Sequence, residues 1–327
     1  MKLPRRQFLH LAAGAAALSA LPHIARAQAY PTRPVRIIVP VASGGLADSL
    51  ARLMGQWLQD RLGQPFVIEN RPGAGNTVGI EAVVKAPPDG HTLLLVGISA
   101  TTGAALYDKL NFNVICDIAP VAAISREPLV MLVNPSLSAE TVPEFIAYAK
   151  ANPDKINIAS SGGIGTITHV AAELFKMMAG VKLIHVPYRG TAQVMTDLLG
   201  GQVQVTFASV PSSIGHIRAD KLRALAVATA RRLEVLPDIP TVGDFLPGYE
   251  ASYWAGIGAS KSTPADIVEK LNKEINAGLA DPKIKTWFAD RAVSTMLPGS
   301  PSDFGQLIAD ETKKWAKVIR AANIKGE

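Results

Sequence analysis

The chain of 327 residues is long enough for about two domains, and its hydrophobic content of 48% is typical of a globular protein rather than a disordered one. Its net charge is +6, but residues 1–27 contribute +4, and the remaining +2 excludes the basic footprint of a nucleic-acid-binding protein. A single cysteine, Cys116, excludes an intrachain disulfide.

The first segment has the build of an export signal. Lys2, Arg5 and Arg6 precede an apolar run at Phe8–Leu21, and a small-x-small site follows at residues 25–27. The run is too short to be a permanent membrane anchor. Because the two adjacent arginines resemble a twin-arginine signal, we expect residues 1–27 to send a folded protein to the periplasm by that route, with cleavage after residue 27 or residue 29.

Short stretches rich in Val, Ile and Leu, bounded by Gly, Pro or Asn, predict strands that are buried on both faces. In chain order they are Val35–Val41, Phe66–Glu69, His91–Gly97, Leu129–Asn134, Ile156–Ser160, Lys182–Pro187, Val203–Ala208, Leu222–Thr229 and Tyr253–Ala259. Between them, Thr141, Thr263 and Ser300 are each followed by a proline and an acid within three residues, which predicts capped helices, the last over Asp303–Ala322. The alternation predicts an α/β protein with mainly parallel sheets.

No disordered linker divides the chain into two consecutive domains. We therefore expect two lobes joined by extended, apolar crossings at Pro128–Asn134 and Tyr253–Ala259. Residues 28–127 and 256–327 would form the first lobe, and residues 128–255 the second. The C-terminal helices would then pack back on the first lobe.

Two glycine-rich loops lead from a predicted strand into a predicted helix. The first holds Ser43, Gly44 and Gly45, and the second runs from Ser160 to Thr166 as "SSGGIGT". Free N–H groups and the helix dipole make such a helix start favourable for an anion, and glycine lets the anion approach the backbone. Ligands of open parallel sheets bind at this end of the strands. Each loop could also be a plain tight turn.

The loops lack the lysine of a phosphate-binding loop and the full dinucleotide pattern, so they favour a carboxylate. Charge-assisted hydrogen bonds contribute about 1.5–3 kcal/mol each, and a micromolar complex needs about 8 kcal/mol. Four or five such bonds would suffice without an arginine. If the loops face each other from two lobes, they form a cleft with donors on both walls.

The whole mature chain, including these two loops, resembles the Bug-type solute-binding proteins, the extracytoplasmic receptors of tripartite tricarboxylate transporters. The motifs that carry the resemblance are "YPTRPVRIIVP", "GGLADSLAR", "LGQPFVIENRPGAGN", "PPDGHTLLL", "HVPYRGTAQVMTDLLGGQV", "HIRADKLRALAVATARR", "LPDIPTVGDFLPGYEASYWAG" and "DPKIKTWF". The resemblance implies a two-lobed periplasmic-binding-protein type II fold with two crossing strands. It also implies a receptor, expected to be a monomer, that closes on a small organic carboxylate and delivers it to membrane transporter subunits.

The resemblance further implies which residues bind the ligand. The donors would come from the first loop, from the second loop, and from the loop after the third strand. Asp48 and His169, each in the first turn of a predicted helix, are also candidates. An acid at such a position can instead interact favourably with the helix dipole, and a histidine can instead pack against neighbouring elements. The expected ligand-binding residues are Ser43, Gly44, Gly45, Asp48, Ser99, Thr101, Ser161, Gly162, Gly163, Gly165, Thr166, His169 and Ala208.

Ala208 stands where many members of that family carry an aspartate that could pair with an amino group. An alanine there disfavours an amino-acid ligand and favours a carboxylate whose remainder is neutral or apolar. The first loop, with Ala42 and Ser43, lacks the family's common prolines and aromatic residue, which predicts a roomier or more polar mouth.

The sequence displays no catalytic triad, cofactor fingerprint or metal-ligand spacing, so we expect no catalytic residues, no cofactor and no metal. Two alternatives stay open at this point. One is a sensor subunit that binds the same acid but docks to a signalling receptor, and the other is an exported Rossmann-like enzyme.

Overall fold

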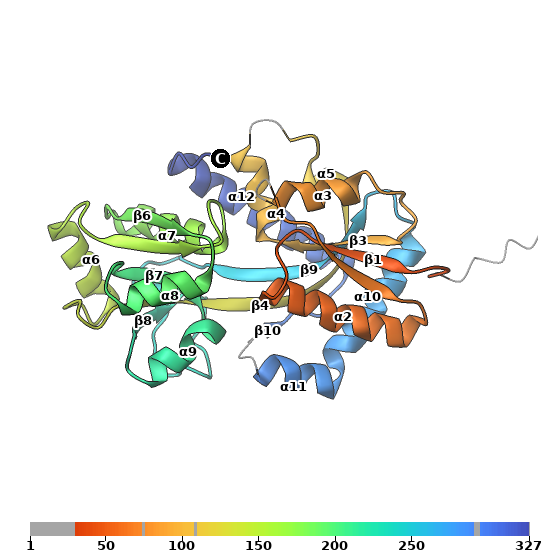
Figure 1. Ribbon diagram of the computed structural model, residues 1–327. Coiled ribbons are helices and arrows are strands. Elements are labelled where there is room, and N and C mark those ends of the chain that lie inside the picture. The colour runs from red at the N-terminus through yellow and green to blue at the C-terminus, as the bar shows by residue number, and fades with distance from the viewer. Residues whose placement is uncertain (1–29, 74–75, 108–109, 291–294, 327) are drawn as a thin grey trace, which may run out of the picture.

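The computed structural model describes residues 30–73, 76–107, 110–290 and 295–326. The expected export signal at residues 1–27 lies outside them. Two lobes lie side by side in Figure 1, joined by long strands that run through the middle of the molecule. Among the described helices, none has the length and apolar character needed to cross a membrane.

The first lobe is built on parallel strands β1 (Val35–Val39), β2 (Phe66–Asn70) and β3 (Thr92–Gly97), in the order β2-β1-β3. β3 is buried along its whole length, which explains its apolar run. The helices of this lobe are α2 (Leu46–Leu62), α3 (Thr77–Val84), α4 (Ile98–Leu106), α5 (Val114–Asp117), α10 (Ala265–Ala280) and α11 (Pro282–Asp290).

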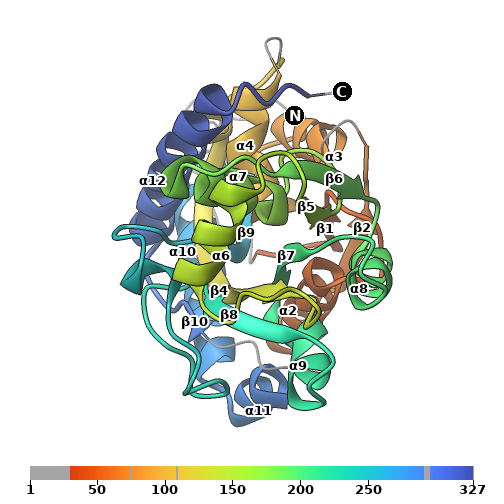
Figure 2. The ribbon, with the colours of Figure 1, turned by 90° about the vertical axis from the view of Figure 1, so that its left-hand side faces the viewer.

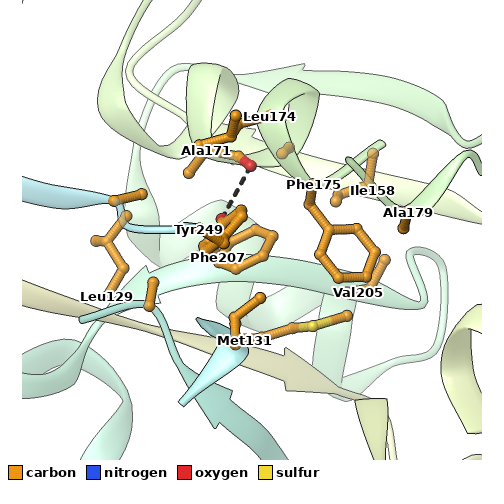
Figure 3. Packing of buried hydrophobic residues seen from close by; sticks show 14 of the residues in the cluster. Leu129, Met131, Ile158, Ala171, Leu174, Phe175, Ala179, Val205, Phe207 and Tyr249 are labelled. Carbon is orange, nitrogen blue, oxygen red and sulfur yellow. Dashed lines mark hydrogen bonds between the residues drawn. The ribbon is translucent and has the colours of Figure 1, made fainter. Parts of the chain in front are cut away.

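The second lobe repeats the design with β5 (Asn157–Ser161) between β6 (Ile184–Tyr188) and β7 (Val205–Ser209), all parallel. β8 (Arg223–Val227) pairs with the crossing strand, and a short 3₁₀ helix, η2, covers Val242–Asp244. The helices here are α6 (Val142–Ala151), α7 (Ile167–Ala179), α8 (Thr191–Leu199) and α9 (Val210–Arg218). The core of this lobe packs Phe175 and Phe207 against Tyr249, whose hydroxyl donates to the Ala171 carbonyl at 3.0 Å (Figure 3).

The crossing strands make the sheet mixed rather than mainly parallel. β4 (Ile118–Val133) pairs along its first part with β9 (Ser252–Ser260) and along its last part with β7 and β8, always antiparallel. β10 (Thr295–Met296) also runs antiparallel to β4. The α/β class is confirmed. The sheet is mixed because both crossing strands, for which the sequence predicted no direction, pair antiparallel with their neighbours.

β4 is also much longer than expected. The sequence predicted a strand at Leu129–Asn134, whereas β4 begins at Ile118. Pro120, Arg126 and Pro128 interrupt the apolar run, and the pairing with β9 shifts register on the way. The crossing at Tyr253–Ala259 is confirmed within one residue by β9. The lobe boundaries at residues 128 and 255 stay a prediction.

The helix caps follow the sequence to different degrees. Ser300 and Asp303 form the full reciprocal capping box of α12 (Pro301–Ala321), and Thr141 accepts the Glu144 N–H at the start of α6. Thr263 was expected to cap α10, but its hydroxyl donates to the Ser260 carbonyl and the helix begins after Pro264.

The last helix, α12, contacts both lobes. Its first half buries Phe304 and Ile308 against the first lobe, and its second half buries Trp315 in the core beneath α7. Figure 2 shows α12 running beside α4 and α7, in agreement with the contacts between these helices. The C-terminal helix therefore packs across the junction and not on the first lobe alone.

Candidate ligand-binding site

A cavity of about 190 Å³ lies between the lobes, at the carboxyl ends of the parallel strands. It is bounded by the segment after β1, the start of α3, the end of β3 with the start of α4, the start of α7, and one residue of β9. The lining residues are Pro40, Val41, Ala47, Asn76, Leu95, Gly97, Ile98, Ser99, Thr166, Ile167 and Tyr253. Among these described residues none is charged.

Besides α3, whose N-cap residue Asn76 lines the cavity, three further helices begin at it. Ala47 lies in the first turn of α2, Ser99 in the first turn of α4, and Ile167 in the first turn of α7. None of the three N-cap residues, Gly45, Gly97 and Thr166, caps its helix with a side chain. Among the described hydrogen bonds, none occupies the main-chain N–H of Ala47, Ser99 or Ile167. The cavity therefore faces unused donors and the positive ends of three helix dipoles.

The first glycine loop is held by an aspartate. Gly44 has φ +88°, and its N–H donates to Asp48 Oδ2 at 3.0 Å. Arg52 Nε donates to the same oxygen at 3.0 Å. The Arg52 hydrogen bond, helped by the Gly44 amide, holds the pKa of the buried Asp48 carboxyl below its ordinary value. Asp48 therefore stabilises the first glycine loop, which belongs to the same lobe.

The other members of the first loop stay apart from the cavity. Ser43, Gly44 and Gly45 are exposed and do not line it, whereas Ala47, one turn further on, does. Their role in ligand binding stays a prediction, and of residues 43–47 it is Ala47 that lines the cavity.

The second glycine loop uses most of its amides internally. The N–H groups of Gly162 and Gly163 both donate to the Tyr188 carbonyl, at 2.9 and 3.2 Å, and the Ser161 N–H donates to Thr168 Oγ1 at 2.9 Å. Thr166 Oγ1 donates to the Ser161 and Gly163 carbonyls. Of the residues expected here, the structure brings Thr166 to the cavity.

Three further candidates are placed away from the cavity surface. Thr101 is buried and donates its hydroxyl to the Ile98 carbonyl at 2.7 Å. His169 is 4% exposed and accepts the Gly165 N–H at Nδ1. Ala208 is 2% exposed in the apolar cluster that includes Val194. An aspartate at position 208 would meet this apolar core.

Sequence reasoning missed Asn76 and Tyr253. Asn76 ends the motif "RPGAGN", a glycine-rich stretch of sequence that comes after β2, and this signal could have found it. Tyr253 carries no local signal, because its approach to the cavity depends on the path of β9 between the lobes.

A larger cavity of about 570 Å³ lies elsewhere between the lobes, lined by residues that include Arg126, Arg231, Arg232, Glu250 and Lys285. No glycine loop and no start of α2, α4 or α7 lines it in the described chain. The smaller cavity, where the helix starts meet, is therefore the candidate ligand site. Among the described residues, no group of three His, Cys, Asp or Glu side chains could hold a metal ion.

Comparison with known proteins decides the family. The profile described as "Tripartite tricarboxylate transporter family receptor" matches residues 50–324. The chain belongs to this receptor family. Protein BugT of Bordetella pertussis is 36% identical over 302 residues, which are 91% of this chain and 92% of BugT.

Solved structures of receptor relatives share the fold. Rpa4515 of R. palustris, solved with adipate, has 34% identity and a TM-score of 0.80 over 90% of this chain and 99% of its own. MatC (Rpa3494) of Rhodopseudomonas palustris, solved with bound malate, has 31% identity and a TM-score of 0.77 over 89% of this chain and 100% of its own. The resemblance read from the sequence motifs is confirmed.

Proposed function

We propose that this receptor binds a short aliphatic dicarboxylate in the cavity between its lobes. The observation that carries the proposal is the convergence of the uncapped starts of α2, α4 and α7 on a cavity without charged lining residues. Main-chain N–H groups can bind carboxylate oxygens there without a counter-ion from a side chain. The two similar proteins solved with adipate and malate support this chemical class.

The remaining walls suit a carbon chain. Val41, Leu95, Ile98 and Ile167 present apolar side chains, and Tyr253 adds an aromatic ring. Burying a methylene group contributes about 0.8 kcal/mol. Three or four charge-assisted hydrogen bonds of about 1.5–3 kcal/mol each, together with a few buried methylenes, reach micromolar affinity after the cost of association. Asn76, Ser99 and Thr166 are the polar side chains that would select among acids.

Membership of the receptor family supports a wider role for the protein. As a transporter receptor, the protein would be exported through its twin-arginine-like signal, act as a monomer in the periplasm, and deliver its ligand to membrane transporter subunits without converting it. Closure would turn one lobe against the other about the crossing strands β4 and β9. No cofactor is proposed.

A thermal-stabilisation screen tests the proposal, since a ligand of the folded state raises stability by mass action. The mature protein is expected to be stabilised by adipate, malate or a related dicarboxylate, with the acid recovered unchanged by NMR. Amines and phosphate esters serve as controls. Stabilisation by phosphate esters alone, or conversion of the acid, would contradict the proposal.

A further inference from the structure

The second glycine loop is held by the imidazole ring of His169, a buried side chain to which the proposed function assigns no role. The N–H of Gly165 donates to His169 Nδ1 at 3.1 Å, and the ring is 4% exposed. Nδ1 can accept this bond when it carries no proton, so the neutral ring must carry its proton on Nε2. Nε2 lies 3.9 Å from Glu173 Oε1, an oxygen that the Lys176 ammonium already contacts at 2.8 Å.

A second imidazole supports the first. The rings of His169 and His185 stack with centroids 3.8 Å apart and planes inclined by 3°, and a hydrogen bond of 2.7 Å joins His185 Nε2 to Ser160 Oγ. Two positive rings so close would repel. Burial, with His185 and Lys176 nearby, lowers the pKa of His169 to about 3, and burial with Lys176 lowers the pKa of His185 to about 4. Both rings are therefore neutral at physiological pH.

The fastened residue sits next to the ligand cavity. Gly165 has φ +77° and lies against Leu106 of α4, so closely that a Cβ would overlap that side chain. The next two residues, Thr166 and Ile167, line the cavity and begin α7. The bond to His169 thus fixes the peptide group that leads into the helix start.

The first loop has the same arrangement with a different acceptor. Gly44 donates its N–H to Asp48, four residues on, as Gly165 does to His169. In the first lobe Arg52 offsets the negative charge of the acceptor. In the second lobe the acceptor is neutral, so it adds no negative charge beneath an anionic ligand.

We propose that His169 is a positioning residue, a neutral acceptor that holds the second glycine loop so that the start of α7 points into the cavity. It contacts the loop and not the ligand. The inference deepens the proposed function and rests on it for its effect on affinity, whereas its effect on the loop can be measured without any ligand.

Three variants of the mature protein separate hydrogen bonding from charge and packing. His169→Asn places an amide oxygen near the position of Nδ1 and should retain the bond. His169→Leu fills similar space without an acceptor, and His169→Asp restores an acceptor with an uncompensated charge. We expect the adipate Kd of the Asn variant to stay within about threefold of wild type, and those of the Leu and Asp variants to rise about tenfold or more. Unfolding of each ligand-free variant checks that the fold persists.

NMR of the ligand-free protein gives the independent readout. The wild type should show an unprotonated Nδ1 on His169 and a slowly exchanging Gly165 amide, and exchange should quicken in the Leu variant but not in the Asn variant. A protonated Nδ1, equal Gly165 exchange in all variants, or a Leu variant that binds adipate as tightly as wild type would overturn the inference. If the wild type binds none of the acids, the proposed function fails, and the exchange data still decide the role of His169.

Discussion

Glu127 and Tyr253 lie directly opposite each other in the antiparallel pairing of β4 with β9. Tyr253 lines the ligand cavity, whereas Glu127 is 1% exposed, and among the described residues its Oε1 has no hydrogen-bond partner. Burial raises the pKa of the Glu127 carboxyl to about 8. Burial, and then Glu127, raise the pKa of the Tyr253 hydroxyl. A protonated acid therefore sits in the strand that joins the lobes.

This acid predicts a loss of stability with rising pH. The folded state holds the Glu127 proton up to about pH 8, while the unfolded chain releases it near the ordinary pKa of 4.5. Between these values the folded state holds the Glu127 proton and the unfolded state does not, so the contribution of Glu127 to the free energy of unfolding falls as pH rises, by at most a few kcal/mol, or about 1.4 kcal/mol per pH unit. The buried neutral His169 and His185 contribute an opposite slope below about pH 6.5, so urea unfolding from pH 5 to 9 should show the Glu127 slope as the difference between wild type and Glu127→Gln. Exposed Glu234→Gln is the control, and equal slopes for wild type and Glu127→Gln would contradict the assignment.

Glu311 ties the C-terminal helix to the junction. Its Oε2 accepts the indole N–H of Trp254 in β9 at 3.2 Å and that of Trp315 in α12 at 2.6 Å. Glu311→Ala leaves two buried donors unpaired, and we expect the free energy of unfolding to fall by about 2–4 kcal/mol. Glu311→Gln keeps an acceptor oxygen and should lose less. Chemical denaturation measures both, and an alanine variant as stable as the glutamine variant would refute this role.

Gly165 and Gly163 form a matched pair for the second loop. Both have positive φ, but a Cβ at Gly165 would overlap Leu106, whereas a Cβ at Gly163 would meet nothing within 4 Å. Gly163→Ala should cost about 1 kcal/mol of backbone strain. Gly165→Ala should cost clearly more and should also weaken adipate binding, because the overlap displaces the start of α7. Denaturation and calorimetry on the two variants test this, and equal effects would argue against the close packing.

Ala47 offers a way to fill the cavity without touching a side-chain hydrogen bond. It lines the cavity from the first turn of α2, and leucine is nearly as good a helix former. Ala47→Leu should weaken adipate binding about tenfold or more and change the free energy of unfolding by less than about 1 kcal/mol. Ala104→Leu on the exposed face of α4 is the control. Adipate affinity that survives in the Ala47 variant would move the ligand out of this cavity.

Much of the architecture could be predicted from the sequence, because apolar runs and helix caps such as Ser300 determine the secondary structure of their own segments. Most strands appear within about two residues of the expected bounds, and both glycine loops lie at the carboxyl ends of strands. The strand predicted at the position of β4 was too short, because Pro120, Arg126 and Pro128 interrupt its apolar pattern. In the structure, pairing with β9 and β10 stabilises the first part of β4. Long-range pairing of this kind leaves no local signal.

The identity of the ligand-binding residues stays a prediction, but several features expected of the site are present in the structure. The helix starts do converge, and Ser99 and Thr166 line the cavity. The sequence could not show that the amides of Gly44, Gly162 and Gly163 are taken up within their own lobes, because their partners Asp48 and Tyr188 are brought near by the fold.

The most direct test of the account is a crystal structure of the mature protein with adipate. We expect one carboxylate to accept hydrogen bonds from main-chain N–H groups in the first turns of α2, α4 or α7, with the carbon chain against Ile98 and Tyr253. Adipate seated in the larger cavity beside Arg231 and Lys285, paired with their side chains, would contradict it.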